Sequence, residues 1–288
     1  MATDYTAISS YAYVANSPLI FTDPDGRKVK PMNQEALQII KLSLTPEEAQ
    51  FIELTDDGFI NQERLQEGMT KLSSTSENFG DLMILVGHEE IIEVNVSENL
   101  SALDGEGTLK NNAEIPLSFA DPAVAADDWV LFGGNPDLSG EIPYMGKAMS
   151  YEEFKISDYD GDDYAPSGTT GVSLIPLGTP PNTEFDRKLT NILPLKDQKF
   201  STNSNYQVVL NKRLFGKSKG LLRKLVITYS HEINGHILFK LQGKSMFHGQ
   251  TRKCPEGNCE NYNQELEERI LEVSEEAGEN FDKHEDKN

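Results

Sequence analysis

The sequence predicts an α+β protein in which short strands are combined with amphipathic helices. Apolar residues recur at helical spacing, or surround a helical motif, in residues 33–44, 221–242 and 261–281. Short apolar runs bounded by turn residues indicate strands in residues 81–94, 171–177 and 206–210. At 288 residues, the chain is long enough for one large domain or two small ones.

Residues 9–27 predict a strand followed by turns around Pro18 and Gly26. The segment also follows the spacing Y-x-Y-x-x-N-x-P-x-x-x-x-D-P-x-G, carried by Tyr11, Tyr13, Asn16, Pro18, Asp23, Pro24 and Gly26. This spacing resembles the end of the Rhs repeat-associated core, where the motif closes a large β-cage. In that family, the segment that follows is typically a toxin delivered into a competing cell.

The Rhs resemblance implies that residues 1–27 are the end of such a core and that residues 28–288 are its C-terminal toxin segment. The chain is then a fragment of a larger protein that is secreted or delivered into a target cell, and an immunity protein is an expected partner. The N-terminus itself has neither the basic nor the apolar region of a signal peptide.

Residues 28–170 are expected to form an N-terminal α+β region, either a separate lobe or part of one domain. Helices are predicted over residues 33–44, 46–54 and 62–72. The second of these begins with a capping box formed by Thr45 and Glu48.

Residues 81–94 predict a β-hairpin, because two apolar runs flank a short polar connection at residues 87–90. Residues 128–133 predict a buried strand. The carboxylates of residues 151–168 are candidate calcium ligands, but they lack the ligand order of an EF-hand, so a solvated acidic loop is favoured.

Residues 171–288 contain the strongest chemical signal, His231-Glu232-Ile233-Asn234-Gly235-His236. In helical H-E-x-x-H motifs, two histidines four positions apart bind zinc and the glutamate acts as general base. Here the second histidine is five positions away, which separates the imidazoles by about 140° in a regular helix. A single π-type turn restores their alignment, and Gly235 eases that distortion. We therefore predict a π turn in which His231 and His236 bind Zn²⁺ and Glu232 is the base.

The six residues HEINGH fit H-E-x-x-G-H and resemble the zinc signature of the dipeptidyl peptidase III family. This match supports the metal chemistry and implies nothing about substrate or fold. The region also looks like zincin-type peptidases, which implies a zincin-like core of mixed sheet, motif helix and following ligand helix. In such peptidases an edge strand ahead of the motif helix pairs with the substrate, and residues 207–211 are the candidate.

The third metal ligand has two candidates, Glu276 and His248. Residues 261–281 predict a helix whose apolar stripe contains Leu266, Ile270, Val273, Ala277 and Phe281. This stripe places Glu276 on its border, together with Glu265 and Glu272, and directs Glu268 into solvent. The resemblance to gluzincin-type enzymes, which take a glutamate from a later helix, favours Glu276. His248 is the rival because it follows the motif closely.

Composition excludes other classes of function. The formal charge of −21 repels phosphate backbones and attracts basic peptides, so a nucleic-acid partner is not expected. No apolar run approaches the length of a membrane span. Cys254 and Cys259 are too few to complete a structural zinc site, and they form either a free pair or a short-loop disulfide.

The sequence therefore predicts a zinc-dependent metallopeptidase that acts on protein or peptide substrates as the toxin of an Rhs protein. The alternative is a non-enzymatic, metal-stabilised interaction or adaptor module at the end of an Rhs chain. Glu232 distinguishes these two functions, because a structural zinc site is closed by a fourth protein ligand and needs no base.

Overall fold

The computed structural model describes residues 28–98, 100–110, 141–144, 147–150, 170–192, 195, 198–216, 219–248 and 263–285. The predicted end of the Rhs core, the strand at 128–133, the acidic loop at 151–168 and the cysteine pair all lie outside these residues. Within the described ranges, no helix has both the length and the apolar character that a membrane span requires.

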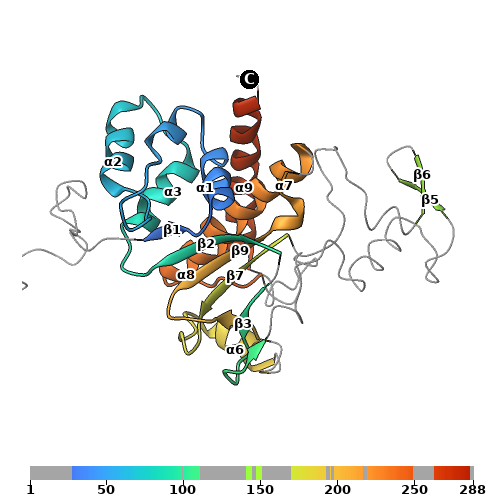
Figure 1. Ribbon diagram of the computed structural model, residues 1–288. Coiled ribbons are helices and arrows are strands. Elements are labelled where there is room, and N and C mark those ends of the chain that lie inside the picture. The colour runs from blue at the N-terminus through green and yellow to red at the C-terminus, as the bar shows by residue number, and fades with distance from the viewer. Residues whose placement is uncertain are drawn as a thin grey trace, which may run out of the picture.

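A mixed seven-stranded sheet runs through the described part of the chain in the order β1-β2-β9-β7-β8-β3-β4 (Figure 1). Its strands are β1 (Val29–Pro31), β2 (Ile92–Ser97), β3 (Ala102–Leu103), β4 (Leu109–Lys110), β7 (Gly171–Pro176), β8 (Phe200–Ser201) and β9 (Tyr206–Asn211). β1, β2 and β9 are parallel, whereas β7 is antiparallel to β9. A separate hairpin joins β5 (Glu141–Tyr144) to β6 (Lys147–Ser150). The predicted α+β class with a mixed sheet is thus confirmed.

The described residues also form helices. They are α1 (Gln34–Leu42), α2 (Gln62–Lys71), α3 (Glu77–Val86), α6 (Glu184–Ile192), α7 (Lys219–Ser230), α8 (Leu238–Leu241) and α9 (Gln264–Glu285), with 3₁₀ turns η2 (Glu48–Phe51) and η4 (Lys212–Leu214). The π-helical segment η5 (His231–Ile237) joins α7 to α8, and we call residues 219–241 the motif helix. Figure 1 shows α1, α7 and α9 gathered over the sheet, and these three helices contact one another.

One hydrophobic core links the two regions that the sequence analysis separated at residue 170. Buried side chains from α1 and β2, such as Ile39 and Val94, share a cluster with Val208 of β9, Leu225 of α7 and Phe281 of α9. β2 and β9 are also neighbours in the sheet. The residue-170 boundary therefore does not divide two cores in the described residues.

The first predicted helix is confirmed as α1, and the capping box is formed as predicted. The backbone N–H of Thr45 donates to the Glu48 carboxylate (2.9 Å), and the N–H of Glu48 donates to the Thr45 hydroxyl (3.2 Å). This box opens the 3₁₀ turn η2, which is shorter than the helix predicted over residues 46–54.

The hairpin predicted over residues 81–94 is wrong. Residues up to Val86 belong to α3, and only the second apolar run forms a strand, β2. A short apolar run is compatible with either a buried helix or a strand. The helix is capped at its N-terminus by Ser76, whose hydroxyl accepts from the N–H of Phe79 (3.2 Å).

The substrate-binding edge predicted at residues 207–211 is also wrong. These residues lie in β9, which has β2 on one side and β7 on the other. An inner strand has both rows of its backbone groups engaged in the ladder, so it cannot pair with a peptide. The strand that contacts the π-helical segment most extensively is β7.

Candidate metal centre

The π-helical turn is confirmed at His231–Ile237, where the motif's spacing predicts it. It brings the two motif imidazoles onto one side of the helix, with ring centroids 4.9 Å apart and Nε2 atoms 3.1 Å apart. Zn–N bonds of 2.0–2.1 Å in tetrahedral geometry place two nitrogens about 3.4 Å apart. The separation between the Nε2 atoms of His231 and His236 is therefore close to that of two ligands on one zinc ion.

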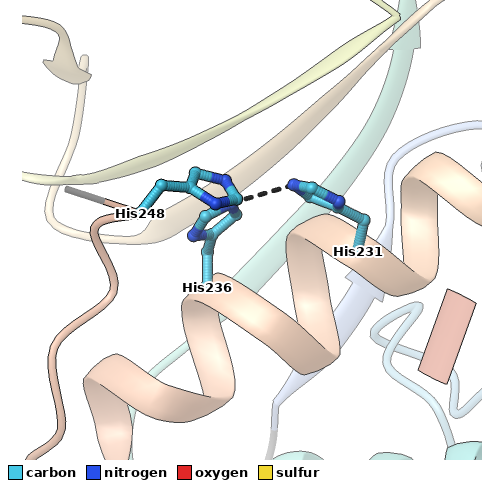
Figure 2. Close-up of side chains that lie close together, drawn as sticks. All are labelled: His231, His236 and His248. Carbon is cyan, nitrogen blue, oxygen red and sulfur yellow. Dashed lines mark hydrogen bonds between the residues drawn. The ribbon is translucent and has the colours of Figure 1, made fainter. Parts of the chain in front are cut away.

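His248 completes the cluster from the segment that follows α8. Figure 2 shows its ring next to that of His236, with the ring of His231 facing both, and the candidate ligand atoms of all three lie within 4.8 Å of one another. Its ring centroid is 5.4 Å from that of His231 and 4.7 Å from that of His236. His236 is buried, whereas the other two are half-buried, so the cluster lies at the molecular surface. Three imidazoles of this kind are a donor set suited to Zn²⁺.

Contacts behind the rings orient two of these histidines. The Nδ1 atom of His236 lies 2.6 Å from the carbonyl oxygen of Met246, and Nδ1 of His248 lies 2.6 Å from the Glu267 carboxylate. An oxygen acceptor at Nδ1 fixes the proton there, which leaves the lone pair of Nε2 for a metal. In both residues these contacts favour the tautomer that metal binding needs.

The preference for Glu276 as third ligand is corrected by this geometry. The helix α9 does place Glu276 half-buried on the border of its apolar stripe. That border faces the N-terminus of α3, where the carboxylate accepts from the N–H groups of Glu77 (2.9 Å) and Asn78 (2.7 Å). Glu276 is thus a helix cap, stabilised by the partial positive charge at that end of α3.

The other carboxylates considered for α9 are also placed elsewhere. Glu265 pairs with Lys244 (2.8 Å) and Glu272 pairs with Arg269 (2.9 Å). Glu268 is exposed, as the apolar stripe predicted, but Glu265 and Glu272 are exposed as well, so the predicted border holds for Glu276 alone. His248 is therefore the third donor among the residues that the structure describes.

Glu232, the predicted base, is 9% exposed and points toward β7. The Ser173 hydroxyl lies 2.5 Å from its carboxylate and 3.1 Å from its backbone carbonyl. Sequence reasoning missed Ser173. Its only signal is a small polar residue within the apolar strand GVSLIP.

A buried polar network attaches the π-helical segment to α3 and α9. Asn78 accepts from the Ser230 hydroxyl (2.7 Å) and from the Asn234 amide, and it donates to the carbonyl of Val273 (3.1 Å). All of these side chains are buried. Because a buried amide is costly unless its hydrogen bonds are made, this network favours one placement of the turn. Nothing in the sequence connects Asn78 to a motif so distant along the chain.

Burial also shifts the pKa values of groups on the α3 and α9 side of the motif helix. Burial raises the pKa of Asp81 to about 6, although Arg269 opposes this shift as its ion-pair partner. Burial raises the pKa of Tyr229 as well, and the nearby Asp81 adds to the effect. These groups belong to the packing behind the helix, whereas Glu232 is the carboxylate within the motif.

Gly235 is required at its position because α9 packs directly on the π-helical turn. A Cβ atom added there would lie 2.5 Å from Cγ1 of Ile270. We expect Gly235→Ala to lower the free energy of unfolding by about 1–3 kcal/mol, as overpacking of a core does. Urea denaturation measures this. The control is Gly80→Ala in α3, where an added Cβ meets nothing within 4 Å; it should not destabilise, and equal losses in both variants would contradict the packing argument.

Comparisons with protein-family models, with curated proteins and with solved structures find no match to this chain.

Proposed function

We propose that this chain is a zinc-dependent metallopeptidase with a zincin-like core, and that it acts as the C-terminal toxin of an Rhs polymorphic toxin. The observation that carries the enzymatic proposal is the convergence of three imidazoles, of which His231 and His236 belong to the helix that also carries Glu232. The Rhs assignment depends on the motif in residues 11–26 alone.

The three histidines match the donor set of a catalytic zinc site. Structural zinc sites have four protein ligands, whereas catalytic sites have three and leave the fourth position for water or substrate. Among the described residues, the cluster contains three donors. Glu232 follows the first of them in the same π-helical turn, and a glutamate at this position of an H-E motif is the expected general base.

In the proposed reaction, zinc supplies Lewis acidity that lowers the pKa of water to about 7 and polarises the scissile carbonyl. Glu232 takes a proton from the attacking water, whose oxygen bonds to the carbonyl carbon. Glu232 then gives this proton to the amide nitrogen as the C–N bond breaks, so that one carboxyl and one amine product leave. Ser173 holds the Glu232 carboxylate, and the contacts at Met246 and Glu267 hold the rings of His236 and His248.

Removal of the metal tests this proposal. We expect purified protein to cleave fluorescently labelled histone, a basic substrate suited to the charge of −21, and to lose that activity in a chelator. Added Zn²⁺ should restore cleavage because the protein ligands remain in place. Protein that cleaves neither histone nor casein when loaded with zinc, but melts at a lower temperature in the chelator, would instead be the metal-stabilised adaptor.

A further inference from the structure

An apolar groove of about 730 Å³ lies beside the candidate metal centre. Its apolar lining includes Ile175 and Leu177 from β7 and the following turn, Phe200 from β8, and Met246 and Phe247 from the segment after the motif helix. A volume of this size is within the range of pockets that bind small molecules or a few residues of a peptide.

The groove is continuous with the site through residues that belong to both. Ser173 lines the groove and donates to Glu232. Met246 also lines it, and its carbonyl contacts His236. Phe247 lines it as well and immediately precedes His248. A peptide whose scissile bond lies at Glu232 therefore has a neighbouring side chain at the mouth of the groove.

The chemistry of the wall and rim selects an apolar occupant. Leu177 is 43% exposed in the groove wall. Leu195 is 53% exposed, and its carbonyl accepts from the N–H of Gly105 (2.7 Å), which lines the groove. Exposed leucines around a concavity are typical of binding surfaces.

The groove wall contains one buried cation, and its other two charged residues, Glu106 and Lys199, are exposed. Lys240, 6% exposed, donates through its ammonium group to the carbonyl of Pro180 and to Asn182 (2.9 Å). A second ammonium or guanidinium group in the groove would be repelled by it.

We propose that this groove binds a bulky apolar side chain next to the scissile bond. The inference rests on the proposed peptidase function and names its substrate class. The net charge of −21 attracts basic polypeptides as a whole, and the groove selects among their bonds those flanked by a residue such as leucine or phenylalanine.

The test uses short internally quenched peptides of glycine, serine and arginine that differ only at one central position, occupied by Leu, Phe, Lys or Asp. The zinc-loaded protein should cleave the Leu and Phe peptides with kcat/KM at least roughly tenfold above the other two. Leu177→Asp should lower this preference by roughly tenfold, because it places a charge in the groove wall. Leu271→Asp is the control, since Leu271 is 59% exposed on α9 and does not line the groove.

A binding assay separates the groove from the catalytic proposal. The same peptides are titrated, uncleaved, into zinc-loaded Glu232→Gln protein and followed by fluorescence anisotropy. Cleavage without an apolar preference, unchanged in Leu177→Asp, would overturn the groove inference and leave the peptidase proposal standing. If the peptides bind with an apolar preference that Leu177→Asp weakens, but the parent protein cleaves none of them, the groove inference stands and the peptidase proposal is overturned. A protein that neither binds nor cleaves any of these peptides would overturn both.

Discussion

Replacing His248 with alanine is expected to lower the affinity for zinc by more than about 100-fold. His248 supplies one of the three nitrogens that converge on the site. Loss of a metal ligand should lower the affinity by more than the 10- to 100-fold by which loss of an orienting partner lowers it. Competition with a chromogenic chelator measures the affinity, and circular dichroism shows whether the variant is folded.

Two further variants of α9 distinguish metal binding from packing. Glu276→Ala should keep its zinc affinity but lower the free energy of unfolding by about 1 kcal/mol, because the N–H groups of Glu77 and Asn78 lose their acceptor. Glu267→Ala should weaken zinc binding by about tenfold, because it removes the partner of His248 Nδ1. If Glu276→Ala loses zinc while His248→Ala retains it, the three-histidine site is wrong.

Replacing Glu232 with glutamine is expected to lower the rate of peptide hydrolysis by about 100-fold to 10,000-fold while zinc binding is kept. Glutamine has the shape of glutamate and still accepts from the Ser173 hydroxyl, but it cannot take a proton from water. Initial rates on labelled histone and zinc content on the same preparation check this. Full activity would exclude the proposed mechanism, and loss of zinc would make Glu232 a ligand.

Local sequence signals predicted the part of the site that is built by one helix. The distance of five residues between His231 and His236 requires a π turn if both bind one metal, and that turn is present. The apolar stripe of α9 likewise predicted which face of this helix is buried. Leu266, Val273 and Phe281 on that face are all buried. In both cases, the spacing along one element determines the geometry.

The rest of the site depends on contacts between elements, which spacing cannot give. The apolar stripe of α9 correctly placed Glu276 on the border of the core. It could not show that the neighbour of Glu276 there is the N-terminus of α3. The residues of α3 were predicted to belong to a hairpin, because the apolar run LMILV is compatible with a buried helix or with a strand. Ser173 was missed for the same reason, since only the packing of the π-helical segment on β7 brings it to Glu232.

The most direct test of the three-histidine site is anomalous diffraction at the zinc edge from crystals of the zinc-loaded protein. We expect one peak about 2.0–2.1 Å from the Nε2 atoms of His231, His236 and His248, with its fourth position held by a non-protein oxygen close to Glu232. A peak elsewhere, or a fourth protein ligand closing the site, would contradict the catalytic proposal.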